Sequence, residues 1–256
     1  MPDDAPSPEI PADARAFPDE RAAGRHRTRD RVSAAIEVVV VCGFPTQIGL
    51  VYVLALLGQF PVDGQLSMGY VTLLLGLDAS LVIALVVWFL RRRGDSLRET
   101  FLGGRPIGRE ALIGLPLTLV VFGIVIVVLS LVQILAPWLH NVPVNPIAGL
   151  IRTGRDAAIF GLVATFAGGV REEIQRAFVL RRFERYLGGA RVGLVVFSVA
   201  FGAGHALQGW DAAITTGLLG AFWGVVYLAR GSIVAPMVSH SAFNAAEIVR
   251  FAVWGS

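Results

Sequence analysis

Long apolar segments separated by short polar ones dominate the sequence after residue 33. A helix needs about 20 mostly apolar residues to cross the hydrocarbon core of a bilayer, and seven segments approach that length. They cover residues 34–58, 67–90, 110–135, 157–180, 192–208, 212–229 and 231–253. Helices satisfy their own backbone hydrogen bonds in lipid. The pattern therefore predicts an all-α, polytopic transmembrane helix bundle of about seven spans.

The first 33 residues differ from the rest of the chain. They contain five prolines and 13 charged residues but no apolar run. Such a stretch cannot bury enough apolar surface to offset the entropy lost on ordering. We expect residues 1–33 to be a disordered tail and residues 34–256 to form one transmembrane domain.

Composition and charge support a membrane protein. Charged residues make up 16% of the chain, against about 25% in soluble domains, which excludes a water-soluble globule. All 22 lysine and arginine residues are arginine, which we attribute to genomic base composition. Together with the family resemblance given below, this leads us to expect a GC-rich bacterium and a multi-pass protein of its cell (inner) membrane. Seventeen arginines fall in the tail, in residues 91–109 and 181–191 and at Arg230, and two fall in the opposite loops. This asymmetry predicts a cytoplasmic N-terminus, and it makes the lipid bilayer, rather than nucleic acid, the partner of the basic residues.

Polar side chains interrupt three of the apolar segments. Five of the six residues from Arg171 to Arg176 are polar, the next segment contains His205, and the last contains His240 and Asn244. Counted from the flanking arginines at 1.5 Å per residue, these groups lie about 13 to 21 Å deep in a core about 30 Å thick. Ionisable groups at such depth are costly and indicate function.

These residue types suit hydrolysis, although other chemistries use them too. A carboxylate beside a histidine can deprotonate a water molecule, and a second histidine with an asparagine can stabilise an oxyanion. His and Glu side chains are also ligands of catalytic zinc. A proton or ion relay in a transporter uses the same groups, and a purely structural polar network is a further alternative.

Three motifs give the chain a resemblance to a known family. They are Glu172-Glu173 followed by Arg176, Phe201 with His205 four residues later, and His240 with Asn244 four residues later. In this order the motifs resemble those of the CPBP family of intramembrane endopeptidases, the CAAX-processing and bacteriocin-processing (Abi) group. The resemblance covers about residues 157–247. One departure is that the family places its arginine one residue later, where this chain has Ala177.

The resemblance implies a role for each motif residue. Glu172 with His205 would activate the water molecule, and His240 with Asn244 would hold the oxyanion. Glu173 and Arg176 would position them, since Arg176 still reaches both carboxylates at helical spacing. The implied substrate is a peptide or membrane protein cleaved within or near the bilayer. The sequence fixes no oligomeric state.

A metal ion is an alternative that the residues leave open. Zinc would require Glu172, His205 and His240 to converge. Asn244 is a poor zinc ligand, and Arg176 near the glutamates would repel a dication. We therefore expect catalysis without a metal cofactor.

Two further acids, Glu37 and Asp78, lie in the first two apolar segments. A lone carboxylate in an apolar helix needs a partner or a polar cavity. We expect each to pack against a polar neighbour, with a place in the substrate cavity as the alternative.

Overall fold

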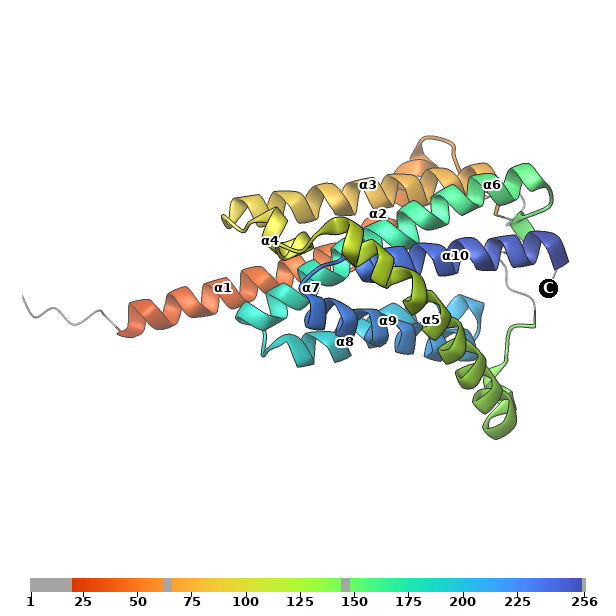
Figure 1. Cartoon of the computed structure of the whole chain (residues 1–256). Coiled ribbons are helices and arrows are strands. Elements are labelled where there is room, and N and C mark those ends of the chain that lie inside the picture. The colour runs from red at the N-terminus through yellow and green to blue at the C-terminus, as the bar shows by residue number, and fades with distance from the viewer. Residues whose placement is uncertain (1–19, 62–65, 144–147, 255–256) are drawn as a thin grey trace, which may run out of the picture.

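The computed structural model describes residues 20–61, 66–143 and 148–254, with the backbone alone for residues 20–27. Every regular element in these ranges is a helix, which confirms the predicted all-α class (Figure 1). The α-helices are α1 (Glu20–Val41), α2 (Phe44–Leu56), α3 (Met68–Arg92), α4 (Leu97–Leu102), α5 (Ile107–Leu135), α6 (Gly154–Val163), α7 (Glu172–Tyr186), α8 (Ala190–Ala203), α9 (Trp210–Arg230) and α10 (Val234–Trp254). A π-helix, η4 (Ala164–Arg171), joins α6 to α7, and short 3₁₀ turns include η5 (Ala206–Gln208).

Each predicted apolar segment contains a helix or a run of joined helices, but seven spans are not confirmed. In the described residues three helical segments are long and apolar enough to cross a membrane, namely Met68–Arg92, Leu97–Leu135 and Trp210–Arg230. A fourth is counted if α1 and α2, bent by 50° at their break, form one span. The count falls short because α8 has only 14 residues, and because α7 and α10 carry many of the polar side chains.

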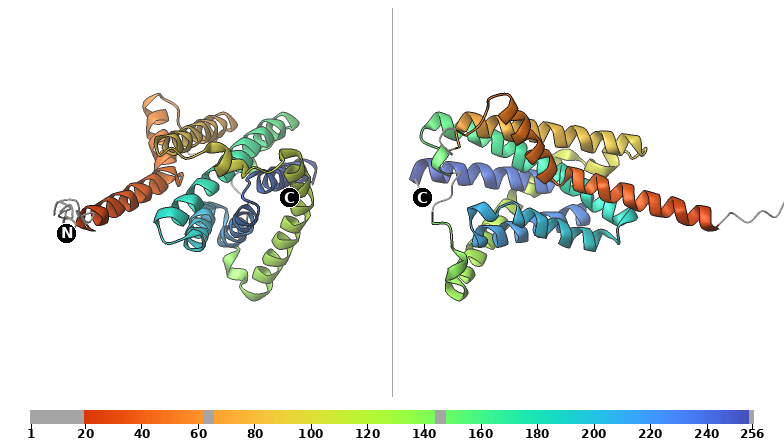
Figure 2. Two further views of the ribbon diagram at one scale, coloured as in Figure 1. Left: turned by 60° about the vertical axis from the view of Figure 1, so that its left-hand side comes forward. Right: turned by 180° about the vertical axis from the view of Figure 1, so that it is seen from behind.

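The start of α1 differs from the predicted boundary of the tail. Residues 1–19 lie outside the described range, but α1 already begins at Glu20 and runs to Val41 without interruption. The apolar second half of the helix packs on α7 and α2. Its first part extends beyond the other helices (Figure 2), because a helix anchored at one end propagates at little cost per residue.

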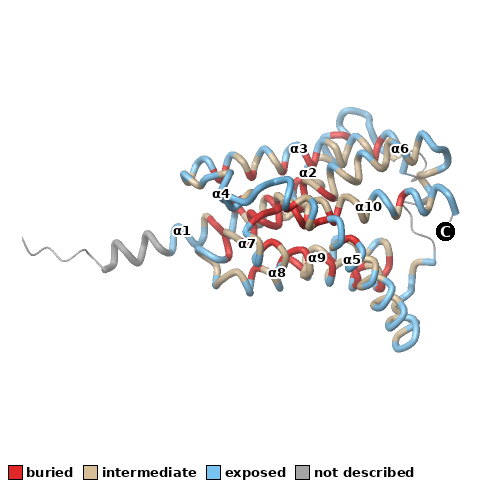
Figure 3. Tube along the Cα trace, in the orientation of Figure 1, coloured by how far each residue is buried: buried red, intermediate tan, exposed pale blue. Residues whose placement is uncertain are grey.

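Helix α7 lies at the centre of the bundle, where most of its residues are buried (Figure 3). It contacts α1, α3, α4, α8 and α9. Its apolar residues Phe178, Val179 and Phe183 join a core cluster with Val82 and Val86 of α3. The polar residues at the start of α7 are therefore held by surrounding helices on several sides.

Helices α8 and α9 cross closely because both carry glycine at the crossing. A Cβ atom added to Gly202 would lie 2.6 Å from the Ala213 carbonyl oxygen and 3.1 Å from the Gly217 Cα. Real Cβ atoms do not approach backbone so closely, so the crossing requires glycine. This hairpin fixes the turn after α8 that carries His205.

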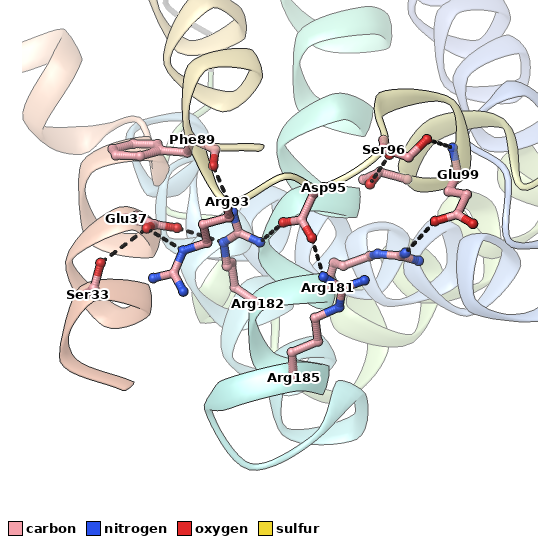
Figure 4. A network of polar contacts seen from close by, with 11 residues as sticks. Ser33, Glu37, Phe89, Arg93, Asp95, Ser96, Glu99, Arg181, Arg182 and Arg185 are labelled. Carbon is pink, nitrogen blue, oxygen red and sulfur yellow. Dashed lines mark hydrogen bonds and ion pairs between the residues drawn. The ribbon is translucent and has the colours of Figure 1, made fainter. Parts of the chain in front are cut away.

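Charged residues form a buried network at the arginine-rich end of the bundle (Figure 4). Arg182 of α7 donates to Glu37 of α1 at 2.7 Å and to Asp95, between α3 and α4, at 2.6 Å. Arg93 donates to the same Glu37 at 2.8 Å, and Arg185 pairs with Asp95. Burial alone would raise the pKa of Asp95, but hydrogen bonds and charge from Arg182 and Arg185 hold it below its ordinary value. Glu37 therefore has the polar partners that were expected of it.

Replacement of Arg182 by alanine tests this network. The change leaves Glu37 and Asp95 buried with fewer cations, and loss of one partner from a buried ion pair costs about 3–5 kcal/mol. We expect the free energy of unfolding in detergent micelles, measured by denaturant titration, to fall by about that amount. The adjacent Arg181→Ala is the control, because Arg181 pairs at 3.7 Å with a Glu99 side chain that is 72% exposed and such pairs contribute less than about 1 kcal/mol. Equal losses in the two variants would contradict the assignment.

Candidate active site

The π-helix η4 leads directly into the glutamate pair at the start of α7. Its Gly168 and Gly169 let it approach α10 closely. A Cβ atom on Gly169 would lie 1.9 Å from Ser241 Oγ, and one on Gly168 would lie 2.5 Å from Asn244 Nδ2. Single π-helical turns within α-helices are frequent at functional sites. Here the turn brings the glutamates and α10 together.

His240 lies between the two glutamates. Its Nδ1 is 2.9 Å from Glu173 Oε1, and its Nε2 is 3.8 Å from Glu172 Oε2. An ionised carboxylate only accepts hydrogen bonds, so Nδ1 carries the proton and donates to Glu173. This bond fixes the orientation of the ring and directs Nε2 towards Glu172.

Glu173 also pairs with Arg176 one turn further along α7. Both side chains are buried, with 1% and 0% of their surfaces exposed. The arginine therefore reaches Glu173 from a position three residues later, as predicted, but among the described residues no ion pair joins it to Glu172. Ala177, at the usual position of the family's arginine, is buried in an apolar cluster with Leu180 and Tyr227.

An aromatic enclosure surrounds this charged group. The guanidinium carbon of Arg176 lies 5.0 Å from the ring centre of Phe197, 5.2 Å from that of Phe201 and 5.6 Å from that of Trp223. The Trp223 ring also stacks on the His240 ring, with 3.8 Å between ring centres. Its Nε1 donates to Ser239 Oγ at 3.2 Å. Aromatic faces attract a desolvated cation, which compensates in part for the burial of Arg176.

Glu172 is held far less tightly than Glu173. Its side chain is 17% exposed, and the 3.8 Å contact with His240 Nε2 is its one ion-pair contact within the described residues. That distance is too long for a direct hydrogen bond, and one water molecule could bridge such a pair. The Glu172 carboxylate is thus available to a small molecule.

Asn244 lies one turn beyond His240 on α10. Its Nδ2 donates to the Ala164 carbonyl of η4 at 3.3 Å. An amide nitrogen carries two hydrogens, so this bond uses one and leaves the other.

His205 lies at the edge of this group. Its Nδ1 is 2.9 Å from the Phe201 carbonyl oxygen, which can only accept, so Nδ1 carries a hydrogen, and in the neutral form of the ring Nε2 is the acceptor. The Phe201 ring contacts both imidazoles, at 5.1 Å from His205 and 6.4 Å from His240 between ring centres. Among the described contacts none joins His205 directly to Glu172.

The structure thus brings Glu172, Glu173, Arg176, His240 and Asn244 together and places His205 one aromatic side chain away. No group of three or more His, Cys, Asp or Glu in the described ranges could hold a metal ion. The alternative zinc set of Glu172, His205 and His240 accordingly does not form a three-ligand site in this arrangement.

Several residues of the site were not identified from the sequence. Trp223 looks like an ordinary apolar helix residue, and Ser239 is one of many small residues in its segment. Gly168 and Gly169 offered a signal, since paired glycines beside a polar motif indicate a close helix approach. No sequence periodicity indicated the π-helix.

Fold and site together define an all-helical membrane protein with a carboxylate, imidazole and amide group buried between helices. Residues 154–246 match the family model described as Type II CAAX prenyl endopeptidase Rce1-like. The match covers less than half of the chain and contains all three motifs, so the resemblance predicted from the motifs is confirmed for this segment. Among curated proteins and solved structures no match to the chain is found. The family supports an intramembrane endopeptidase in general, and a protease rather than a transporter.

The close packing of η4 on α10 gives a prediction about Gly169. In Gly169→Ala the new methyl group meets Ser241, and overpacking of this kind costs about 1–3 kcal/mol. We expect a corresponding fall in the free energy of unfolding in detergent micelles. Gly161→Ala in α6, where a Cβ atom meets nothing within 4 Å, is the control. If Gly169→Ala were as stable as this control, η4 and α10 would not pack as described.

Proposed function

We propose that the protein hydrolyses a peptide bond by means of a water molecule activated by Glu172. The observation that carries this proposal is the arrangement around His240, which is fixed by Glu173 on one side and faces Glu172 across 3.8 Å on the other. A water molecule between Glu172 and this ring would be within reach of a carboxylate base, as general-base catalysis requires.

His240 and Asn244 are suited to the charge that develops on the substrate. When His240 is protonated, Nδ1 donates to Glu173 and Nε2 becomes a second donor. The remaining hydrogen of Asn244 Nδ2 is the other donor. Two donors fixed before the reaction, in a site with little water, stabilise an oxyanion strongly. The Glu173 carboxylate, itself paired with Arg176, lies 2.9 Å from Nδ1 and holds the ring in this orientation.

We assign His205 a supporting role in handling the proton taken from water. Its free Nε2 is an acceptor, as a proton shuttle needs. The Phe201 ring between His205 and His240 separates the two imidazoles, which is unfavourable for the continuous relay of a proton-coupled transporter. We therefore propose a protease and not a transporter.

The substrate we propose is a peptide or membrane protein that reaches the site within the bilayer. We propose the cell (inner) membrane as its location. The N-terminus is proposed to be cytoplasmic because the arginines gather in the segments on one side, as the positive-inside rule describes.

Glu172→Gln tests the proposal. The amide keeps the shape but cannot accept a proton, and loss of a general base costs about 10²- to 10⁴-fold in rate. We expect quantitative proteomics of membranes from cells with and without this variant to reveal an uncleaved precursor. Glu184→Gln, on an exposed position of the same helix, is the control and leaves the precursor processed. Normal processing with Glu172→Gln would refute the proposed chemistry.

Chelator treatment distinguishes glutamate catalysis from zinc catalysis. Because the described residues form no three-ligand group, we expect purified protein in vesicles to keep cleaving that precursor after exhaustive dialysis against a strong chelator. Elemental analysis should find well under one zinc per chain. Activity that is lost on chelation and restored by stoichiometric zinc would establish a metalloprotease on the same residues.

A further inference from the structure

The break between α1 and α2 lies against the helix that carries Glu172. Gly43 at the break has a φ of +95°, and Pro45 follows in the first turn of α2. In a continuous helix the amide of residue 45 would donate to the Val41 carbonyl, but proline has no N–H. The Gln175 side chain of α7 donates to that carbonyl instead.

Three buried side chains form a connected group at this break, and one of them belongs to the residue directly before Glu172. Arg171 Nη2 lies 2.7 Å from one carboxylate oxygen of Asp78 on α3, and Thr46 Oγ1 donates to the other at 2.6 Å. The same hydroxyl oxygen lies 3.0 Å from the Gly43 carbonyl oxygen, so its single hydrogen is shared between the two acceptors. We call Thr46, Asp78 and Arg171 the Arg171 cluster. Asp78 thus has the polar neighbour expected of it and lies outside the catalytic group.

The guanidinium of Arg171 fills the space that Gly43 leaves open. A Cβ atom at Gly43 would lie 2.7 Å from Arg171 Nη2. Glycine is therefore required at this position for two reasons: the positive φ, and the space that the Arg171 guanidinium occupies. The Arg171 guanidinium is confined by Asp78 on one side and by the junction between α1 and α2 on another.

We propose that the Arg171 cluster positions Glu172 for catalysis, which rests on the function proposed above. Among the described residues Glu172 has only the 3.8 Å contact with His240, so its location depends on the backbone that carries it. The π-helical turn ends at Arg171, and Arg171 and Glu172 both have regular right-handed helical dihedrals, with φ of −62° and −70°. Successive helical residues point about 100° apart, so an anchor on Arg171 determines where the Glu172 carboxylate projects.

The charged network of Arg182 does not serve the same purpose. It lies ten residues further along α7, about 15 Å away at the helical rise, and anchors the other end of the helix. Arg182→Ala therefore removes a buried ion pair from the same helix without touching η4. It serves as the control for a loss of stability alone.

The test compares Asp78→Asn and Gly43→Ala with Arg182→Ala and with Gly49→Ala, where a Cβ atom meets nothing within 4 Å. The probe is the precursor that accumulates with Glu172→Gln, cleaved in vesicles by equal amounts of folded protein. We expect kcat to fall about 10- to 100-fold in Asp78→Asn and Gly43→Ala, as small misplacements of a catalytic group do, with KM within about twofold. Both controls should keep the wild-type kcat. Unchanged kcat in the first two variants would overturn the proposal.

Hydrogen exchange gives a readout independent of cleavage. Amides of residues 164–172 should exchange faster in Asp78→Asn than in Arg182→Ala, and equal exchange would also overturn the positioning role. If the first variants fold poorly, Thr46→Val, which removes a single hydroxyl, replaces them in both measurements under the same criteria. Cleavage that persists in Glu172→Gln refutes the proposed function itself, whereas cleavage that needs Glu172 but not Asp78 refutes only the positioning role.

Discussion

A charge buried away from water requires a partner, and this requirement determines how α7 sits in the bundle. Apolar surfaces pack in many orientations, and lipid offers no hydrophobic drive for one of them. Ion pairs are directional. Three residues of η4 and α7 have such partners on other helices: Arg171 on α3, Glu173 on α10, and Arg182 on α1 and the loop after α3. Arg171 and Glu173 hold the start of α7, and Arg182 anchors its far end.

Buried ion pairs of this kind contribute orientation more than net stability, since well-packed apolar residues can replace them with little loss. The exception on α7 is therefore informative. Within the part of the chain that the structure describes, Glu172 lies among these partnered groups with one ion-pair contact, at 3.8 Å. A carboxylate kept in place by its neighbours, but not neutralised by them, can still take a proton.

The sequence predicted the class of the fold and the grouping of five motif residues, Glu172, Glu173, Arg176, His240 and Asn244, from local patterns. Apolar length indicates membrane helices, and a spacing of four residues places His240 and Asn244 on one helix face. It did not predict the π-helix, which depends on how two glycines meet α10. It also treated Arg182 as one of several flanking arginines, because its burial is decided by Glu37 and Asp95 far away in the chain. His205 was expected beside Glu172, but the turn after α8 places it next to Phe201.

The missing donor of Pro45 has a consequence for the order of assembly. The carbonyl it leaves free is satisfied by Gln175, 134 residues later in the chain, so contacts of very high sequence separation complete the N-terminal helices. Such contacts form late, because a long loop must close before they contribute. The matched region, residues 154–246, and the segment before it therefore complete each other's contacts. A shortened chain that keeps only the matched region would lack the groups that receive Arg171, Gln175 and Arg182.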